Sequence, residues 1–442
     1  MIVRSLDWRS PIAAFTPLAG MNGAHLFHAG EYNDGGWSVI AAFPADSLEF
    51  QGDDPERWLA ELRKLIAGRA VFHDAPMPFA SGLAGYIGYE ALAGLEPSLA
   101  LPPSPYALPA AHFGVYDAVA GFHKATQKAV ICARNGEAAD RLESALGVED
   151  AREDALPIFE NLSSNFTSPA YEQAVVDVIA RIRDGDIFQA NIAQTLQAQT
   201  SVAFSSLSVF ARIAEASDAF FSALLQFDQG DIISNSPERF FELSQDGSIL
   251  TEPIKGTRPR GITNEEDRAL ADALLEDPKD RAENIMIADL MRNDLSRICA
   301  DHSVKEAAIC DLLTLSRVHH LVSRITGHLS ADTDVTDAIA ALIPGGSVTG
   351  APKVEAMRII GEIEKSGRGP YCGVIGYIDD RGGADFSIAI RTMISDRARR
   401  KIYIPVGGGV TLRSDPVAER EETIVKARAA LSAIGLSTED AT

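Results

Sequence analysis

A lysine in the stretch TEPIKGTRPRG, residues 251–261, lies in a segment that cannot form a regular helix. Pro253 and Pro259 interrupt this segment, and Gly256 loosens the backbone directly after Lys255. The apolar residues SIL before it predict a strand, so Lys255 is expected where this strand leaves its sheet. Lys255 is then either a solvated loop residue or an amine held in a pocket for covalent chemistry. Its surroundings must decide between the two.

A carboxylate is expected in the buried stripe of the helix DPKDRAENIMIADLMRNDLSR, residues 277–297. At 100° per residue Glu283 falls into that stripe. The other members of the stripe are Met286, Ile287, Leu290, Met291 and Asp294. Burial of an unpaired carboxylate costs several kcal/mol, so Glu283 must be protonated, ion-paired or bound to a cation. A salt bridge to Arg281 or Arg292 is the alternative to a metal or substrate site.

A second predicted helix, SDPVAEREETIVKARAAL at residues 414–431, carries two more carboxylates. Ser414 is the expected N-cap. Glu419, Glu422 and Lys426 share one face at spacing i, i+3, i+7. That face is either simply solvated, or its two glutamates serve a hard cation such as Mg²⁺. The opposite, buried seam is expected to contain Val417, Ile424 and Leu431.

Two glycine-rich segments, IPGGSVTGAPK at residues 343–353 and PVGGGVT at residues 405–411, are predicted to be loops. Without side chains their backbone N–H groups can approach a carboxylate closely. Neither segment has the GK[ST] ending of a P-loop or a GxGxxG that opens a helix, so nucleotide binding is not indicated. Plain turns are the alternative.

The elements that must position these residues suggest an α+β chain. Residues 1–150 contain short apolar runs broken by Gly and Pro, which predict an antiparallel sheet with a helix at DPERWLAELRKLIAG. The acidic residues 147–168 predict a linker. A helix with Ser168 as its N-cap follows and ends at Gly185. Helical and strand-like segments then alternate irregularly, which predicts a second, C-terminal part over residues 165–435.

Composition narrows the class of protein. The 442 residues carry 40 basic and 62 acidic side chains, a net charge of −22 that disfavours nucleic-acid binding. A small anionic ligand would therefore need a local positive field. No apolar run approaches the roughly 20 residues that span a membrane. The four cysteines form no CxxC pair, which suggests reduced thiols in a cytoplasm.

The order and the amino-acid sequences of these segments resemble those of the chorismate-utilising enzymes. SNSPERF with Glu238, PIKGT, DRAENIMIADLMRND, GGSVTGAPK, GVIGY…SIAIRT and EREETIVKARA follow one another as in that family, over about residues 165–432. GLAGYIGYEAL at residues 82–92 extends a weaker likeness. Within the family the chain resembles the aminodeoxychorismate synthase component I branch, which converts chorismate and ammonia to 4-amino-4-deoxychorismate for 4-aminobenzoate and folate. The resemblance implies a two-layer α+β fold of antiparallel sheets with helices packed outside.

The resemblance also implies a role for the lysine. In that branch a lysine at the position of Lys255 is proposed to attack C2 of chorismate while the C4 hydroxyl leaves. Ammonia then adds at C4 and expels the lysine. The attack needs a neutral amine, which burial and a neighbouring Mg²⁺ favour. Glu238 matches the family's general acid, which would give the leaving hydroxyl its proton.

Further roles are implied by position. Glu283 and Glu422 resemble the Mg²⁺ ligands, with Asp280 and Glu419 as neighbouring or water-mediated partners, and the metal would hold the ring carboxylate. Gln189 stands where isochorismate and salicylate synthases have a water-activating lysine, so water addition is disfavoured. Residues expected to hold the enolpyruvyl carboxylate or line the pocket are Thr257, His320, Tyr371, Arg391, Gly407, Gly408, Gly409 and Lys426. One of the adjacent His319 and His320 is expected to be structural only.

Other functions compete with this interpretation. Anthranilate synthase component I adds ammonia at C2 and eliminates pyruvate, but it usually carries Ala at the position of Lys255. The chain also lacks an LLES-like stretch in its first 50 residues. A non-catalytic binding protein would not need all the residues above, and a pyridoxal-phosphate site would need a phosphate cradle. Because these motifs leave no room for a glutaminase domain, a separate glutamine amidotransferase subunit is expected.

Overall fold

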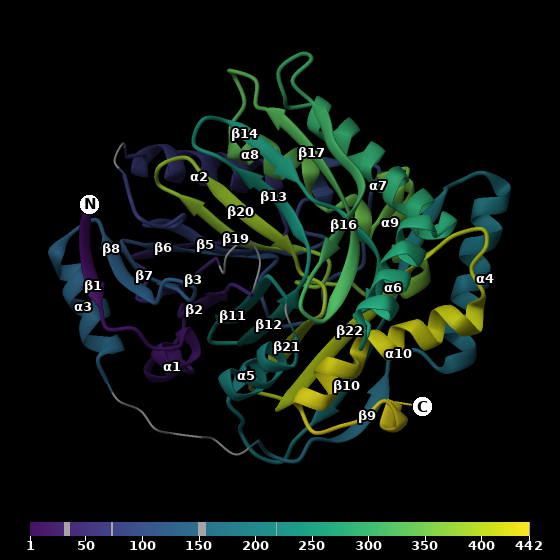
Figure 1. Ribbon diagram of the computed structural model, residues 1–442, viewed down its shortest axis with the longest axis horizontal. Helices are drawn as coiled ribbons and strands as arrows, with labels where there is room; N and C mark the ends of the chain where they lie inside the picture. Colours follow the sequence, from purple (N-terminus) through teal and green to yellow (C-terminus); the bar gives the residue numbers. More distant parts are fainter. Residues whose placement is uncertain (31–35, 72–73, 149–155, 218, 442) are drawn as a thin grey trace.

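The computed structural model describes residues 1–30, 36–71, 74–148, 156–217 and 219–441, in which two antiparallel sheets form the centre (Figure 1). The strands of the first sheet are β1 (Ile2–Leu6), β2 (His25–His28), β3 (Trp37–Ala41), β7 (Ala118–His123), β8 (Lys128–Ala133), β9 (Glu160–Ser164), β10 (Gln189–Gln199), β11 (Phe221–Gln226), β12 (Gly230–Ser236), β18 (Gly350–Ala351), β21 (Thr392–Asp396) and β22 (Lys401–Val410). Their order is β1-β8-β7-β3-β2-β11-β12-β21-β22-β10-β18, and β9 pairs with β10.

The strands of the second sheet are β4 (Asp46–Phe50), β5 (Gly82–Ile87), β6 (Ala111–Tyr116), β13 (Arg239–Leu243), β14 (Ser248–Thr251), β15 (Ile254–Pro259), β16 (Lys305–Thr314), β17 (Val318–His328), β19 (Val374–Asp379) and β20 (Ala384–Ile388). Their order is β15-β17-β14-β13-β20-β19-β5-β6-β4, and β16 pairs with β17. Residues 1–150 and 165–435 thus both contribute strands to both sheets.

Helices cover the outer faces. They are α1 (Pro11–Phe15), α2 (Pro55–Arg69), α3 (Gly136–Leu146), α4 (Ser168–Asp184), α5 (Ser206–Ala216), α6 (Asn264–Glu276), α7 (Pro278–Ser296), α8 (Val335–Leu342), α9 (Lys353–Glu364) and α10 (Pro416–Ala433). The short 3-10 helices are η1 (Thr16–Leu18), η2 (Ala93–Leu95), η3 (Gly346–Val348) and η4 (Glu439–Ala441). No helix in the described ranges is long and apolar enough to cross a membrane.

The core lies in layers because strand side chains alternate between faces. In β3, Val39 packs between the sheets with Phe79 and Tyr116, whereas its neighbour Ile40 packs on the outer face with Phe15 of α1. Strands buried on both faces appear in the sequence as continuous apolar runs. The α+β prediction, with antiparallel sheets inside and helices outside, is confirmed (Figure 1).

Two crossovers between the sheets lie side by side. The chain passes from β12 to β13 through Glu238, and it returns from β20 to β21 through Arg391. The N–H of Ile388 donates to the carbonyl oxygen of Glu238 at 3.1 Å, and the N–H of Asn235 donates to that of Arg391 at 3.1 Å. Glu238 and Arg391 are therefore fixed where the chain crosses between the interior strands of the two sheets.

Two predicted helix starts are wrong by one residue. Thr167, with extended backbone, caps α4 by accepting from the N–H of Ala170, so Ser168 is already helical. Asp415 caps α10, and Ser414 instead donates from its hydroxyl to Glu419 at 2.6 Å. The end of α4 at Gly185 is confirmed by its left-handed backbone, φ 86°.

Three other sequence interpretations also change. Part of the predicted linker, Glu160–Ser164, forms β9 beside β10, while residues 149–155 lie outside the described chain. The glycines of PVGGGVT belong to β22, which pairs with β10 as far as Val410, and are not a loop. In α10, Ile424 and Leu431 are buried as predicted, but Val417 is 44% exposed.

Candidate active site

Lys255 lies within β15, not at the exit of β14 as the sequence suggested. In the pairing of β15 with β17, Lys255 opposes Leu321 and Thr257 opposes His320, so Gly256 is the extra residue of a bulge. Gly256 has φ +79°, and a Cβ there would lie 2.9 Å from Cγ of Asp280. The bulge thus requires glycine, and it re-aims the backbone immediately after the half-buried Lys255.

The glycine strand, Gly407, Gly408 and Gly409 of β22, lies between Lys255 and α10. A Cβ on Gly409 would be 3.6 Å from Nζ of Lys255. A Cβ on Gly408, which faces the other way, would be 3.3 Å from Oε2 of Glu419. Larger residues would fill the space between these charged groups, which explains three glycines inside a strand.

Glu238 is a buried carboxyl group beside two cations. Burial raises its pKa to about 7, although the Ser347 hydroxyl and the charges of Lys255 and Arg391 partly offset this effect. Its side chain is 4% exposed, and Oε1 accepts no hydrogen bond. Arg391 is exposed to solvent and has a positive φ of 50°. Near neutral pH Glu238 can therefore both hold and release a proton, as a general acid must.

The two adjacent histidines of β17 face opposite ways. Nδ1 of His320 lies 2.9 Å from the Thr257 hydroxyl, and burial together with the charge of Arg391 lowers the pKa of His320 to about 4. Nε2 of His319 lies 2.9 Å from Oδ1 of Asp267, on α6. A neutral His320 thus lies with Thr257 and Arg391, and His319 belongs to a separate network.

Carboxylates of α7 and α10 converge beside the glycine strand. Nζ of Lys279 lies 4.0 Å from Oε1 of Glu283 and 3.9 Å from Oε1 of Glu419. Burial raises the pKa of Glu283, opposed by the charges of Lys255 and Lys279, and burial also raises the pKa of Glu419. Burial acts in the same direction on Glu422, but Lys426, 2.7 Å away, together with the charges of Lys279 and Lys255 outweighs it and lowers the pKa of Glu422.

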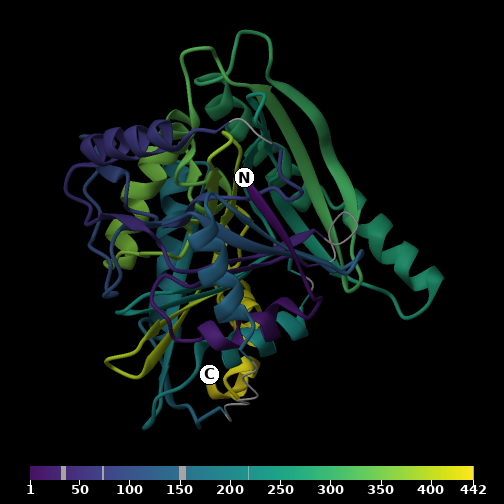
Figure 2. The ribbon, with the colours of Figure 1, turned by 90° about the vertical axis from the view of Figure 1, so that its left-hand side faces the viewer.

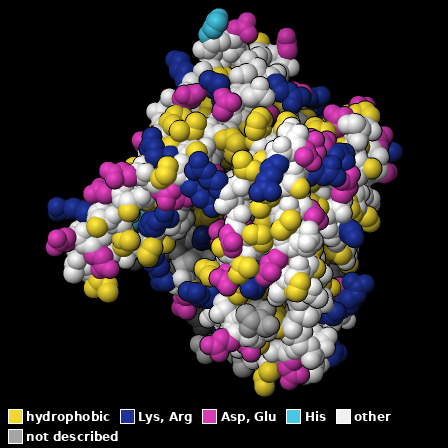
Figure 3. Space-filling model, turned by 90° about the vertical axis from the view of Figure 1, so that its right-hand side faces the viewer, with side chains coloured by type: hydrophobic (Ala, Val, Ile, Leu, Met, Phe, Trp, Pro, Cys, Tyr) yellow, Lys and Arg dark blue, Asp and Glu magenta, His cyan; other side chains and the backbone are white. Residues whose placement is uncertain are grey.

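A hollow opens on the side of the molecule that carries α6 and α10, with lysine and arginine side chains around it (Figure 3). In Figure 2, α6 and the long β16–β17 hairpin stand at one side of the molecule. Aspartate and glutamate side chains lie among these cations, so the rim of the hollow carries both signs of charge.

Comparison with known proteins identifies the family. Residues 26–432 match the family model described as chorismate binding enzyme. This chain belongs to that family. The "Aminodeoxychorismate synthase component 1" of Salmonella typhimurium is 35% identical over 96% of both chains. The "Anthranilate synthase component 1 1" of Haloarcula marismortui is 36% identical over 90% of this chain and 85% of its own.

A solved structure agrees with this assignment. Anthranilate synthase component I from Streptococcus pneumoniae superposes with a TM-score of 0.79 at 29% identity and covers 96% of this chain and 97% of its own. The protein is therefore a chorismate-binding enzyme with the family's fold. Relatives of two different activities are equally similar, so overall similarity does not choose between aminodeoxychorismate and anthranilate synthesis.

Two predicted site residues of this chorismate-binding enzyme are deeply buried. Tyr371 is 4% exposed and packs in the core with Val348 and Phe240. Gln189 opens β10, pairs with Ala351 of β18, and keeps a buried Oε1 without a hydrogen-bond partner. Their roles towards chorismate stay predictions.

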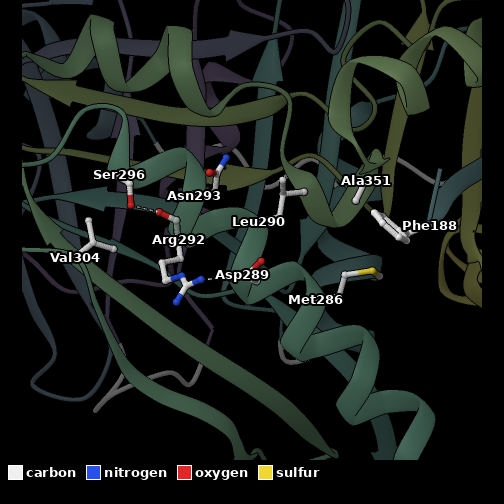
Figure 4. A pocket seen from close by; sticks show the side chains of 9 residues that line it. All are labelled: Phe188, Met286, Asp289, Leu290, Arg292, Asn293, Ser296, Val304 and Ala351. Atoms are coloured by element: carbon white, nitrogen blue, oxygen red, sulfur yellow. Dashed lines mark hydrogen bonds and ion pairs between the residues drawn. The ribbon is translucent and has the colours of Figure 1, made fainter. Parts of the chain in front are cut away.

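A separate cavity of about 680 Å³ lies along the side of α7 (Figure 4). It is lined by Phe188, Met286, Asp289, Leu290, Arg292, Asn293, Ser296, Val304 and Ala351. Phe188 and Ala351 adjoin Gln189, and the other lining residues come from α7 and Val304. It contains none of the predicted site residues.

Sequence reasoning missed three residues of the site. The hydroxyl of Ser347 lowers the pKa of Glu238, and Lys279 lies between Glu283 and Glu419. Oδ1 of Asn191 lies 2.9 Å from the position that a Cβ on Gly407 would take. Lys279 is four residues before Glu283 and could have been found from helical spacing. Ser347 and Asn191 carry no comparable local signal.

Proposed function

We propose that this chorismate-binding enzyme converts chorismate and ammonia to 4-amino-4-deoxychorismate. The observation that carries the proposal is the position of Lys255: its ammonium nitrogen faces Gly409 across space that a methyl group would touch at 3.6 Å, beside the carboxyl group of Glu238. A lysine and a proton donor thus lie close together, with the charge of Arg391 also acting on Glu238. That is the pair the covalent route needs.

The bond changes divide between these two residues. The Lys255 amine forms a bond to C2 of chorismate, both ring double bonds shift towards C4, and the C4 hydroxyl leaves as water with the proton of Glu238. Ammonia then forms a bond to C4, the double bonds shift back, the bond between C2 and the Lys255 nitrogen breaks, and the surplus proton of the new ammonium group returns to Glu238. The residues proposed to hold the substrate carboxylates and line the site are Arg391, Lys426, Thr257, His320, Tyr371, Gln189, Gly407, Gly408 and Gly409.

The residues present fit Mg²⁺. Glu283 has a buried oxygen without a hydrogen-bond partner, and Glu283, Glu419 and Glu422 offer the carboxylate oxygens that this ion prefers. In the described chain no three acidic, histidine or cysteine side chains form a ready metal cluster. Substrate oxygens and water would therefore complete the coordination. Bound Mg²⁺ would supply positive charge opposite the ring carboxylate.

A second polypeptide is expected to supply the nitrogen. The Salmonella typhimurium relative bears the name component 1, which supports a complex with a second component. We propose that this partner is a glutamine amidotransferase that releases ammonia to the site. The alternative activity, anthranilate synthesis, is favoured by the 36% identical Haloarcula marismortui relative. Lys255 is the residue that argues against it.

Product identification separates the two activities. Purified protein is incubated with chorismate, an ammonium salt and Mg²⁺, and the products are resolved by mass spectrometry. The expected product is 4-amino-4-deoxychorismate with its enolpyruvyl group intact and almost no pyruvate. Anthranilate with one equivalent of pyruvate would overturn the proposal in favour of the alternative.

A further inference from the structure

A buried ion pair lies behind the candidate site and has no part in the proposed chemistry. Arg368, 4% exposed, donates from Nε to Oε2 of Glu364 at 2.9 Å and from Nη2 to Oε1 at 2.6 Å. Glu364 is the last residue of α9, and Arg368 follows in the connection to β19. A buried pair of this kind contributes little net stability compared with apolar residues, which suggests another reason for its presence.

The pair is bound to the backbone of two segments of the site. Arg368 donates from Nη2 to the carbonyl oxygen of Asn191 at 2.6 Å and from Nη1 to that of Val348 at 2.9 Å. Oε1 of Glu364 accepts from the N–H of Ala193 at 2.8 Å. One guanidinium and one carboxylate therefore join β10 to η3.

These contacts lie directly beside the proposed reacting groups. In the ladder between β10 and β22, Asn191 opposes Gly409 and Ala193 opposes Gly407. Val348 follows Ser347, whose buried hydroxyl has no hydrogen-bond partner of its own but lies near enough to Glu238 to lower the pKa of that carboxyl group. A shift of Arg368 would consequently move both the strand that faces Lys255 and the hydroxyl that faces Glu238.

The same guanidinium connects the site to the segment GLAGYIGYEAL, which has no part in the proposed chemistry. The Cζ atom of Arg368 lies 4.7 Å from the ring centre of Tyr89. The carboxylate of Glu90 accepts from the backbone N–H groups of Arg368 and, at 2.9 Å, of Gly369. Residues 82–92 thus contact both the guanidinium group and the backbone N–H of Arg368.

We propose that Arg368 is a positioning residue for chorismate turnover: it fixes the glycine strand and η3 relative to each other without touching the substrate. The planar guanidinium can serve Glu364 and two carbonyl oxygens in fixed directions at once, which a lysine cannot do. The proposal rests on turnover of chorismate by the protein, and it holds whichever aminated product forms.

The matched test compares Arg368→Lys with Arg381→Lys. Arg381, in the turn between β19 and β20, is also a buried arginine paired with a nearby carboxylate, Asp379, and it donates to the carbonyl oxygens of Met77 and Pro78. Both variants keep the charge and lose the fork. The midpoint temperature of thermal unfolding is expected to drop by a similar amount in both variants. A difference in turnover between them would therefore come from the place of Arg368 beside the site and not from lost stability.

Chorismate consumption, measured independently of product, gives the readout. Since a displacement of about 1 Å at a reacting centre costs about 100-fold in rate, kcat of Arg368→Lys is expected to fall about 100-fold, with a smaller change in KM. Arg381→Lys should keep the wild-type kcat. Equal kcat values for the two variants would overturn the proposal, whereas absence of chorismate consumption by the wild type would overturn the proposed function instead.

The pH profile adds a readout that a purely stabilising residue would not change. The groups that lower the pKa of Glu238 against its burial include the Ser347 hydroxyl, Lys255 and Arg391. Displacement of Ser347 should raise the pKa of Glu238 and move the basic limb of kcat to higher pH at constant free ammonia. An unmoved limb counts against the proposal.

If Arg368→Lys does not fold, Glu364→Gln gives the same answer. The amide keeps one oxygen that can accept from Ala193, but its NH₂ group faces the guanidinium donors. It should lower kcat in the same direction and by a smaller factor than is expected for Arg368→Lys. Wild-type kcat in a folded Glu364→Gln protein would contradict the proposal.

Discussion

The ammonium of Lys426 donates a hydrogen bond to the carbonyl oxygen of Gly407 at 2.9 Å. The same ammonium is paired with Glu422 one helical turn earlier, at 2.7 Å. A single side chain of α10 therefore holds the glycine strand and a proposed metal ligand in fixed relation.

Lys426→Met should remove that relation while leaving the fold nearly unchanged. Because exposed ion pairs contribute about 0–1 kcal/mol, the free energy of unfolding in urea should change little. Steady-state kinetics should nevertheless show a fall of roughly 10-fold or more in kcat/KM, of the size expected when a positioned group is displaced. Arg57→Met, which breaks the i,i+4 pair with Glu61 on α2, serves as the control and should leave kcat/KM unchanged.

Removal of a proposed Mg²⁺ ligand should abolish turnover. Glu283→Gln and Glu422→Gln keep the shape of each side chain but remove the charge that attracts the ion. Turnover and Mn²⁺ binding, followed by electron paramagnetic resonance, should both be lost, with circular dichroism unchanged. Glu421→Gln, at an exposed position of α10, is the control. Full activity in excess EDTA would refute the metal assignment.

The buried Glu238 should make stability depend on pH. Its pKa is about 7 in the folded protein against an ordinary value of 4.5. The folded state therefore holds this proton more tightly, and its contribution to stability is complete below pH 4.5 and is lost as pH rises through 7. The loss corresponds to about 3 kcal/mol. Glu238→Gln should thus be more stable than the wild type at pH 8 and equally stable at pH 4 in denaturant unfolding; equal stability at both values would contradict the raised pKa.

Activity should depend on the protonation state of Glu238. If protonated Glu238 is the general acid, kcat at saturating chorismate and constant free ammonia should fall as pH rises above about 7. Glu238→Gln should lose most activity and also this basic limb. A wild-type profile retained by the variant would assign the limb to another group.

The nitrogen source gives a further test. The isolated chain should use free ammonia at alkaline pH and ignore glutamine. The proposed chemistry takes up ammonia directly and assigns the release of ammonia from glutamine to the partner. Glutamine should become a substrate when a glutaminase subunit is added. Hydrolysis of glutamine to glutamate by the purified chain alone would refute the proposed division of labour.

Replacement of the proposed nucleophile should redirect the reaction. Lys255→Ala removes the amine and opens space at C2, so C4 amination should fall by several orders of magnitude and 2-amino or 2-hydroxy products should rise. Mass spectrometry of products measures the ratio, and wild-type protein deprived of ammonia should carry an adduct on the peptide with Lys255. Undiminished 4-amino-4-deoxychorismate formation by the variant would exclude Lys255 as the nucleophile.

Local patterns predicted a large part of this protein. Helical spacing placed Glu283 near the buried side of α7, where its Oε1 is indeed buried, and Gly185 marked the end of α4. The strands in the first 150 residues, such as β5 and β8, also follow from apolar runs and turn residues. These features depend on neighbours within one or two helical turns, which the sequence contains directly.

The glycine strand shows why local patterns fail. Three successive glycines disfavour a strand on propensity alone, so PVGGGVT was expected to be a loop. In the structure β10 supplies the hydrogen bonds, and the charged groups of Lys255 and Glu419 occupy the space that side chains would need. One of these groups, Lys255, precedes the glycines by more than a hundred residues, so no local pattern can reveal why glycine is needed.

By itself the sequence determined the α+β class, the resemblance to the chorismate-utilising enzymes and the chemical types of the site residues, because these depend on composition, periodicity and local motifs. Only the tertiary structure decided that His320 and not His319 lies with Thr257 and Arg391, and that Arg368 joins β10 to η3. Adjacent strand residues face opposite sides, and which side meets the site depends on strand pairing and on two crossovers between sheets. Those long-range pairings arise from the packing of the whole chain.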